Sequence, residues 1–225
     1  MIQNVCIFGD SVAKGIVFDS VKNKYSLLKE NFANIVQQSQ NIEISNYAKF
    51  GCTVSMGNDI LRRHEKQLSS FDFTILEFGG NDCDYNWAEI SDQPFKPHLS
   101  KTPLKQFREQ YISLIERVKQ NGGIPVLLTL PPIDSKRYFQ WISKGLNGRN
   151  ILTYLGSIDN IHNWQGLYST TVTEIAATCK ISIIDIRSAF LEKQDYCEYL
   201  CEDGIHPNKK GHLLISNAIG IKTLI

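Results

Sequence analysis

The 225-residue sequence predicts an α/β fold in which helices cover both faces of a parallel sheet. Strand-like and helix-like stretches alternate along the chain, as in successive βαβ units. The first strand-like stretch, Val5 to Phe8, is an apolar run of the kind found in strands buried on both faces. No repeat, linker or change of composition marks a second domain, so we expect residues 1–225 to form one domain.

Five strands are expected, and each ends near residues that favour turns. The predicted ranges are 5–8, 42–47, 71–78, 124–130 and 181–186. The second range alternates apolar and polar residues, which is typical of a strand. The fourth is stopped by two prolines, which cannot donate to a sheet ladder.

Helices are expected between these strands. The predicted ranges are 21–38, 55–68 with Met56 facing inward, 103–121, the second half of 158–179, 188–194 and 209–219. The range 103–121 is the best marked, because a proline suits its first turn and Asn121-Gly122-Gly123 ends it.

Two segments have no clear periodicity. Residues 83–102 are expected to form an irregular loop, and residues 133–157 a helix plus a flap. Both contain several aromatic residues, and a long loop inside a compact domain is more often functional than idle.

Charge and composition point away from several classes of partner. The formal net charge is +1 and the basic residues are scattered, so we expect no nucleic-acid partner. No apolar run approaches the ~18 residues that span a bilayer, so we expect no membrane partner. The first residues lack the pattern of a secretion signal, so we expect a cytoplasmic protein with six reduced cysteines. Cys197 and Cys201 have no second ligand pair, so no metal site is expected.

Gly9-Asp10-Ser11 directly follows the first apolar run. Gly9 allows a tight exit from the strand, and Asp10 and Ser11 favour turns and helix N-caps. The Ser11 hydroxyl is therefore expected at the carboxyl end of a central strand, where ligands bind in open α/β sheets. Such a tripeptide alone is more often only a turn, so a nucleophilic serine also needs a base and an oxyanion hole.

The stretch 202–208 offers the base. Asp203 and His206 are three residues apart, which in a turn lets the carboxylate reach the imidazole Nδ1 atom. Pro207 favours an extended His206 and the start of the last helix. An imidazole held by a carboxylate is the partner that a serine nucleophile needs. The alternative is a histidine that only caps the loop.

Acyl transfer also needs donors for the carbonyl oxygen, which becomes negative in the transition state. The backbone N–H groups of Ser11 and Gly51 and the side-chain amide of Asn81 all fall at expected strand ends. For Gly51 the alternative is a turn glycine, and for Asn81 an Asx turn.

Four short motifs resemble, in chain order, the four sequence blocks of the SGNH (GDSL-type) hydrolases. They are Gly9-Asp10-Ser11, Gly51, Gly79-Gly80-Asn81-Asp82 and Asp203-Gly204-Ile205-His206. The resemblance implies a flavodoxin-like, three-layer α/β/α sandwich with a five-stranded parallel sheet.

The same resemblance implies a role for each matched residue. Ser11 would be the nucleophile, His206 the base and Asp203 its orienting acid. Ser11, Gly51 and Asn81 would form the oxyanion hole, and Asp10 and Asp82 would brace the loops. Val12 departs mildly from the pattern, because many relatives have Leu, Ile or Thr after the serine.

The sequence favours a serine esterase that hydrolyses a small acyl ester through an acyl-enzyme, without a cofactor. Flat rings stack on sugar faces, so Tyr85, Trp87, Tyr138 and Trp141 suggest an acetylated carbohydrate as substrate; they could equally be the core of a lid. A lysophospholipid or a thioester is the alternative substrate, although no long apolar lid helix is expected. An alternative of another class is a binding module that keeps the fold without turnover.

Overall fold

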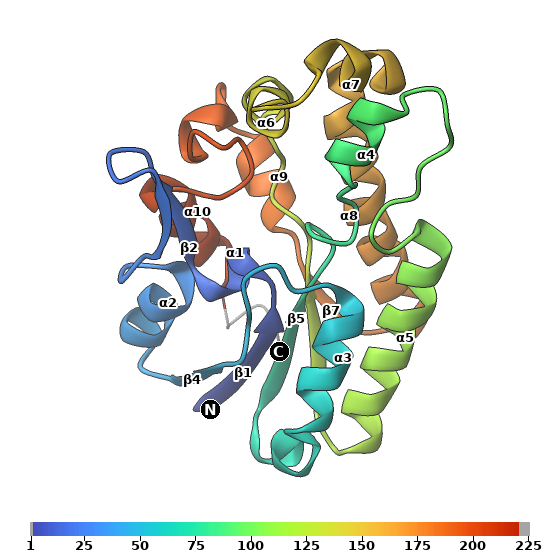
Figure 1. Cartoon of the computed structure of the whole chain (residues 1–225). Coiled ribbons are helices and arrows are strands. Elements are labelled where there is room, and N and C mark those ends of the chain that lie inside the picture. The colour runs from blue at the N-terminus through green and yellow to red at the C-terminus, as the bar shows by residue number, and fades with distance from the viewer. Residues whose placement is uncertain (1, 221–225) are drawn as a thin grey trace.

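The computed structural model describes residues 2–220, and its centre is a five-stranded parallel sheet between two layers of helices (Figure 1). The strand order β4-β1-β5-β6-β7 becomes 2-1-3-4-5 when only these strands are numbered, which is the flavodoxin-like order. The predicted three-layer α/β/α sandwich is confirmed. Residue 1 and residues 221–225, which the predicted domain includes, lie outside the described residues, and the single domain stays a prediction.

Each predicted strand overlaps a strand of the sheet. The strands are β1 (Asn4–Gly9), β4 (Glu43–Asn46), β5 (Phe73–Glu77), β6 (Pro125–Leu128) and β7 (Ser182–Ile184). In β1, Cys6 and Phe8 point into the core on one face of the sheet, and Val5 and Ile7 into the core on the other. This burial on both faces explains why β1 has no polar alternation.

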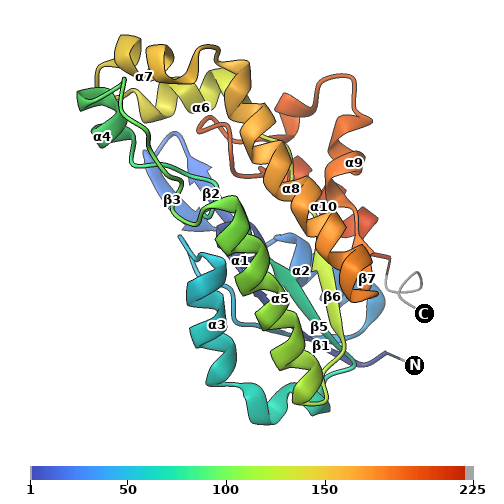
Figure 2. The same ribbon diagram turned by 90° about the vertical axis from the view of Figure 1, so that its right-hand side faces the viewer.

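Three helices cover each face of the sheet. One layer contains α3 (Val54–Arg62), α5 (Leu104–Gln120) and α8 (Asp159–Cys179), and the other α2 (Phe32–Gln40), α9 (Ile186–Leu191) and α10 (Lys209–Ala218). Figure 2 shows α3, α5 and α8 in front of the sheet. The short helix α1 (Ser11–Lys14) and the 3₁₀ helix η2 (Tyr196–Tyr199) pack against the same core as the second layer.

The prediction of one helix over residues 21–38 is wrong in its first half. An antiparallel hairpin of β2 (Ile16–Asp19) and β3 (Lys24–Leu27) precedes α2. Leu27, one of the residues of the predicted helical face, is 59% exposed, and Val21 at the predicted start of the helix is 95% exposed. The Phe18 ring of the hairpin packs on Trp141 of α6 (Ser135–Ile142), and local periodicity cannot predict a contact between residues so far apart in the sequence.

The predicted helix over residues 55–68 is divided. α3 begins after Thr53, whose side chain accepts a hydrogen bond from the Met56 N–H, and a 3₁₀ helix, η1 (Glu65–Ser70), follows α3. The prediction that Met56 faces inward is also wrong, since this residue is 46% exposed. Met56 lies in the first turn of α3, whose buried residues are Val54, Gly57, Ile60 and Leu61.

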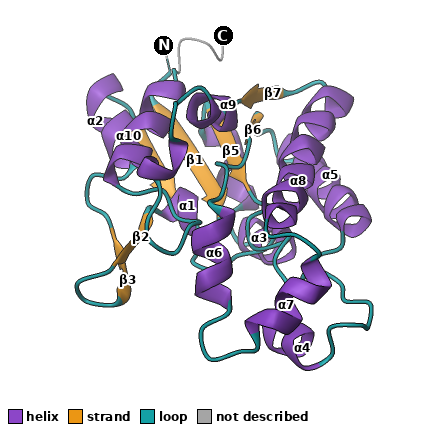
Figure 3. Ribbon diagram, turned by 90° about the horizontal axis from the view of Figure 1, so that it is seen from above, coloured by secondary structure: helices purple, strands orange, loops and turns teal. Residues whose placement is uncertain are grey.

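Three short helices lie beyond the carboxyl ends of the strands (Figures 2 and 3). They are α4 (Trp87–Asp92), α6 (Ser135–Ile142) and α7 (Gly148–Leu155). The segment 83–102 is thus not wholly irregular: the Asn86 side chain caps α4, and Ile90 is fully buried. Likewise, α8 is helical from its start, not only in its second half, because Ile161 is buried in the same cluster as Ile90.

The six cysteines are free in this structure. Within residues 2–220, no helix combines the length and the apolar character needed to cross a bilayer.

Candidate active site

Ser11 follows β1 directly and begins α1. Asp10 is the N-cap of this helix, and its Oδ1 atom accepts a hydrogen bond of 2.8 Å from the Val12 N–H. A Cβ atom at Gly9 would lie 2.6 Å from the Cβ of Ala13, so only glycine fits there. These contacts hold the Ser11 hydroxyl at the carboxyl end of a central strand.

Ser11 and His206 meet although 195 positions separate them in the chain. The His206 Nε2 atom lies 2.9 Å from Ser11 Oγ, and the Nδ1 atom lies 2.6 Å from Asp203 Oδ2. All three side chains are buried. Burial alone would raise the pKa of Asp203, but hydrogen bonds and charge from His206 lower it below its ordinary value. The arrangement is a continuous line from carboxylate to imidazole to hydroxyl.

The loop that carries this pair is shaped by its own backbone and by α6. Asp203 Oδ1 accepts hydrogen bonds from the Ile205 and His206 N–H groups at 3.1 and 3.2 Å. Gly204 has φ +78°, and a Cβ atom there would lie 2.7 Å from the Tyr138 backbone nitrogen. Glycine is therefore required on both conformational and steric grounds.

The three predicted oxyanion donors belong to residues that line the same cavity. They are Ser11, Gly51 and Asn81, and His206 also lines this cavity. The Asn81 Nδ2 atom donates to Asp10 Oδ2 at 3.2 Å, so Asp10 orients the amide. The backbone N–H groups of Ser11 and Gly51 make no hydrogen bond with other residues of the described chain.

Asp82 lies next to Asn81 and is fully buried. Its two carboxyl oxygens accept from the Val54 N–H at 3.1 and 3.2 Å, which ties the loop after Gly51 to the loop of Asn81. Burial raises the pKa of Asp82 to about 6. Asp82 therefore connects two loops of the site, and Asp10 likewise connects the Ser11 turn to the loop of Asn81.

Glu77 is a buried acid beneath this site that the sequence analysis missed. Its Oε2 atom accepts from the Asp10 and Ala13 N–H groups at 3.4 and 3.3 Å. Burial and the neighbouring Asp10 carboxylate raise the pKa of Glu77 well above its ordinary value. A glutamate that ends an otherwise apolar strand was the available sign in the sequence.

A cavity of about 320 Å³ opens beside Ser11 and His206. Its apolar walls include residues of the two segments with no clear periodicity and of α8, together with Leu130; they are Tyr85, Trp87, Leu130, Ile133, Tyr138, Tyr154, Ile161 and Trp164. Three of the four aromatic residues selected from the sequence therefore line the cavity. Trp141 does not, and packs on Phe18 at 4.6 Å between ring centroids.

Asp84 is a second wall residue that the sequence analysis missed. Its Oδ1 atom accepts from Trp87 Nε1 at 2.8 Å and from the Tyr138 hydroxyl at 2.6 Å. Its Oδ2 atom pairs with Lys101 Nζ at 2.8 Å. Asp84 thus joins the segment 83–102 to α6 and occupies the polar atoms of two wall aromatics.

Solved structures with a similar fold include a lipase/acylhydrolase and two esterases. A lipase/acylhydrolase from Enterococcus faecalis has a TM-score of 0.68 and 18% identity, over 98% of this chain and 95% of that chain. A catalytic mutant of an acetylxylan esterase from Geobacillus stearothermophilus has a TM-score of 0.63 and 19% identity, over 96% and 91%. A psychrotrophic esterase from a Pseudoalteromonas species has a TM-score of 0.63 and 15% identity, over 98% and 97%.

These structural likenesses show the fold, and a comparison with family models shows the family. A search of curated proteins finds no match. The model of the GDSL-like lipase/acylhydrolase family matches residues 7–214. The chain therefore belongs to the GDSL-like lipase/acylhydrolase family and is, by class, a carboxylic ester hydrolase.

Proposed function

We propose that the chain hydrolyses its ester with Ser11 as nucleophile, His206 as general base and Asp203 as the acid that orients it. One observation carries this proposal: the Asp203–His206–Ser11 line, with contacts of 2.6 and 2.9 Å. The carboxylate fixes the tautomer that leaves Nε2 free to accept the Ser11 proton. Family membership supports the reaction class, and the geometry supports the roles of the residues.

The reaction proceeds in two steps. Ser11 Oγ attacks the ester carbonyl carbon while His206 Nε2 takes the hydroxyl proton, and that proton then passes to the leaving alcohol oxygen. The product of this step is an acyl-enzyme. Water then attacks the acyl carbon, His206 takes a proton from it and returns one to Ser11 Oγ, and the carboxylic acid leaves. In both steps the N–H groups of Ser11 and Gly51 and the Asn81 amide receive the oxyanion.

The proposed roles of the residues fix how the ester would lie in the cavity. The alcohol oxygen must accept a proton from His206, so the alcohol lies on the side bordered by Tyr25 and Phe50. The carbonyl oxygen lies at the three donors. The remaining substituent, the acyl chain, then extends past Asn81 toward the walls at the ends of β5 and β6.

The chemistry of these walls favours a hydrocarbon acyl group. The Trp87 and Tyr138 polar atoms bond to Asp84, and Trp164 Nε1 donates to the Cys83 carbonyl at 2.9 Å. Because the polar atoms of these rings already have partners, a ligand in the cavity would contact mainly their apolar surfaces. An acetyl group would leave most of the 320 Å³ unfilled. We therefore propose an acyl chain of several carbons, as in a lipid or thioester substrate, over the acetylated carbohydrate that the aromatic residues first suggested.

A series of p-nitrophenyl esters from acetate to octanoate tests both parts of the proposal, because only the acyl chain varies. Burying one methylene is worth ~0.8 kcal/mol, so kcat/KM should rise about fourfold per added carbon until the cavity is filled. Leu155→Trp should remove this preference, because Leu155 lines the cavity. Leu152→Trp is the matched control on the same helix, α7, because Leu152 is exposed and outside the cavity.

The outcomes separate the reaction from the substrate. Ser11→Ala should abolish turnover of every ester, and full activity in that variant would contradict the catalytic role of Ser11. Equal rates for acetate and octanoate would contradict the acyl-chain assignment and leave the triad in place. Wild-type protein that hydrolyses no ester would favour the binding module.

A further inference from the structure

The turn that follows β6 forms part of the cavity wall, and two prolines limit its own hydrogen bonding. The turn consists of Leu130, Pro131, Pro132 and Ile133, and all but Pro132 line the cavity. Proline has no N–H group, so two of these four residues cannot donate a backbone hydrogen bond. The carbonyl groups of the turn still need donors, because an unpaired carbonyl inside a protein is costly. The position of this wall therefore depends on where those donors come from.

Side chains from two helices supply donors to the first two carbonyls of the turn. Arg187 of α9 donates from Nη1 to the Leu130 carbonyl at 3.4 Å. Gln165 of α8 is buried, and its Nε2 atom donates to the Pro131 carbonyl at 2.9 Å. Gln165 also lines the cavity, whereas Arg187 lies behind the wall and does not.

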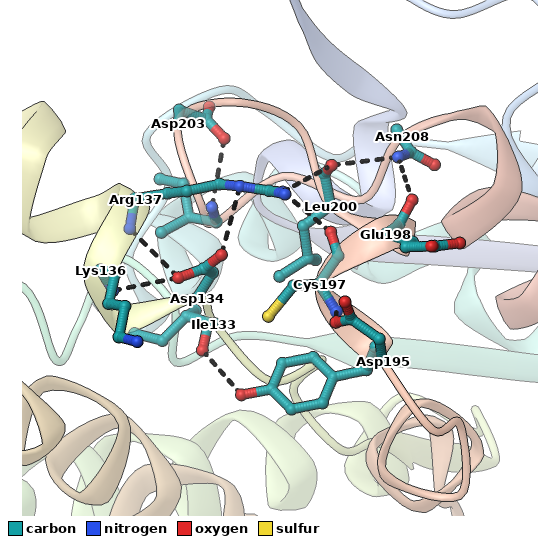
Figure 4. Close-up of polar contacts among 12 residues, drawn as sticks. Ile133, Asp134, Lys136, Arg137, Asp195, Cys197, Glu198, Leu200, Asp203 and Asn208 are labelled. Carbon is teal, nitrogen blue, oxygen red and sulfur yellow. Dashed lines mark hydrogen bonds and ion pairs between the residues drawn. The ribbon is translucent and has the colours of Figure 1, made fainter.

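Arg187 also connects to the third carbonyl, that of Ile133. Its Nη1 atom donates to Gln165 Oε1 at 2.7 Å, and its Nη2 atom lies 3.2 Å from His162 Nε2. A guanidinium can only donate, so this Nε2 atom accepts and His162 carries its hydrogen on Nδ1. The Nδ1 atom lies 3.4 Å from the Ile133 carbonyl oxygen. That oxygen also accepts from the Tyr196 hydroxyl at 3.3 Å (Figure 4).

The Arg187 guanidinium has no carboxylate partner of its own. In the part of the chain that the structure describes it forms no ion pair, and its partners are carbonyl, amide and imidazole groups. Asp185 acts on it through charge, but this carboxylate accepts from Thr129 and Ser188. Burial lowers the pKa of Arg187, as expected for a cation removed from water. Its contribution is therefore the fork of donors that it directs at several acceptors at once.

We propose that Arg187 is a positioning residue for the acyl wall: it fixes the turn after β6, directly at Leu130 and through Gln165 and His162, and so sets which acyl chains fit. The inference rests on the proposed function, in which the acyl chain extends toward this wall. An acetyl group fills little of the cavity, so it has few contacts with the turn. Loss of Arg187 should therefore affect long acyl chains more than acetate. A purely structural role would lower all esters by one factor, because it would only reduce the folded fraction.

The experiment measures kcat and KM for the p-nitrophenyl esters from acetate to octanoate. The quantity compared is the chain preference, defined as kcat/KM for the ester that wild type hydrolyses best divided by kcat/KM for acetate. In Arg187→Met the chain preference should fall about tenfold, since poorer contact with each methylene costs about fourfold. Arg187→Lys should recover part of the loss, because an ammonium group keeps donors but lacks the planar fork.

Two further variants separate the wall from general effects. Tyr196→Phe removes one donor from the Ile133 carbonyl, so the chain preference should fall by a smaller factor, about threefold. Arg108→Met is the matched control, because Arg108 pairs with Glu174 of α8 and neither residue lines the cavity. This control should keep the wild-type chain preference.

A folded Arg187→Met protein that keeps the wild-type chain preference would overturn the inference. If thermal melting shows that Arg187→Met does not fold, Arg187→Lys and Tyr196→Phe decide, and wild-type preferences in both would overturn it. A small fluorophosphonate probe should label Ser11 at a similar rate in wild type and variants. A labelling rate that falls in parallel with the ester rates would also overturn the inference, because the nucleophile and not the wall would then have changed.

Two results in wild type concern the proposed function itself. Equal rates for all esters would contradict the acyl-chain assignment, and a wild-type protein that the probe does not label would contradict the nucleophile. Either result would also overturn the inference that rests on them. Failure of the inference alone appears only as wild type with a chain preference that the Arg187 and Tyr196 variants share.

Discussion

The Asp134 N–H donates to the Gly204 carbonyl at 2.8 Å, which joins the first turn of α6 to the loop between Asp203 and His206. The approach is so close that a Cβ atom at Gly204 would lie 2.7 Å from the Asp134 carbonyl oxygen. The same helix supplies Tyr138 to the cavity wall. α6 thus connects the loop of the proposed base to the surface that we propose for the acyl chain.

Arg137 strengthens this connection, as Figure 4 shows. Its guanidinium donates to the carbonyls of Cys197 and Leu200 at 2.8 and 3.4 Å, and its Nε atom pairs with Asp134 at 3.2 Å. Arg137→Met should loosen the loop and lower kcat about tenfold, because catalysis depends on placing the imidazole within a fraction of an ångström. Arg137→Lys should recover only part of the loss, since one ammonium group cannot reproduce the planar fork.

Steady-state kinetics on the ester series measures this effect, with Arg117→Met as the control. Arg117 pairs with Glu65, and neither residue lines the cavity. Equal kcat values in Arg137→Met and wild type would show that the loop keeps its position without the guanidinium.

Asn81 offers a test of the proposed oxyanion hole. Asn81→Ala should lower kcat roughly 10²–10³-fold and change KM little, because the amide acts on charge that develops in the transition state. Asn81→Asp keeps the shape but replaces a donor with an acceptor, so its loss should be at least as large. Circular dichroism should show an unchanged fold in both. A kcat within about threefold of wild type would remove Asn81 from the hole.

Protonation of His212 should make the free energy of unfolding depend on pH, separately from any effect on catalysis. It is fully buried in α10; burial, and to a lesser extent charge from His206, lower its pKa from 6.5 to about 4. The unfolded chain therefore binds this proton more readily than the folded chain does. The stabilisation is complete above about pH 6.5 and is lost as the pH falls toward 4. The loss in the free energy of unfolding should reach about 2–3 kcal/mol near pH 4.5.

Urea unfolding of wild type and His212→Gln at pH 7.5 and 4.5 isolates this contribution. Other acid-sensitive groups act equally in both proteins and cancel in the difference. Wild type should lose more stability than the variant between the two pH values, and equal losses would exclude His212 as the source.

Much of the site follows from short stretches of sequence, because its chemistry depends on turns at strand ends. Gly9, Ser11, Asn81 and His206 each lie next to residues that define a turn or a strand, so their meeting at one edge follows from a parallel sheet. The roles assigned to them depend on experiments such as those above.

The remaining features depend on contacts between distant segments. The segment around Tyr25 is predicted to be helical, but it forms a hairpin whose Tyr25 ring packs on Trp141, a residue distant in the sequence. Glu77 lies in an apolar strand whose sequence favours a core, and its partner is Asp10 on the neighbouring strand end. Trp141 and Met56 show that an aromatic or apolar residue can be assigned to the wrong surface when the tertiary arrangement is unknown.

The most direct test of the central claim is labelling by a fluorophosphonate probe, followed by mapping of the modified peptide by mass spectrometry. Wild type should react at Ser11, Ser11→Ala should not react, and His206→Asn should react at least 10²-fold more slowly because the hydroxyl loses its base. Wild-type protein that stays unlabelled, or labelling that persists in Ser11→Ala, would contradict a nucleophilic Ser11.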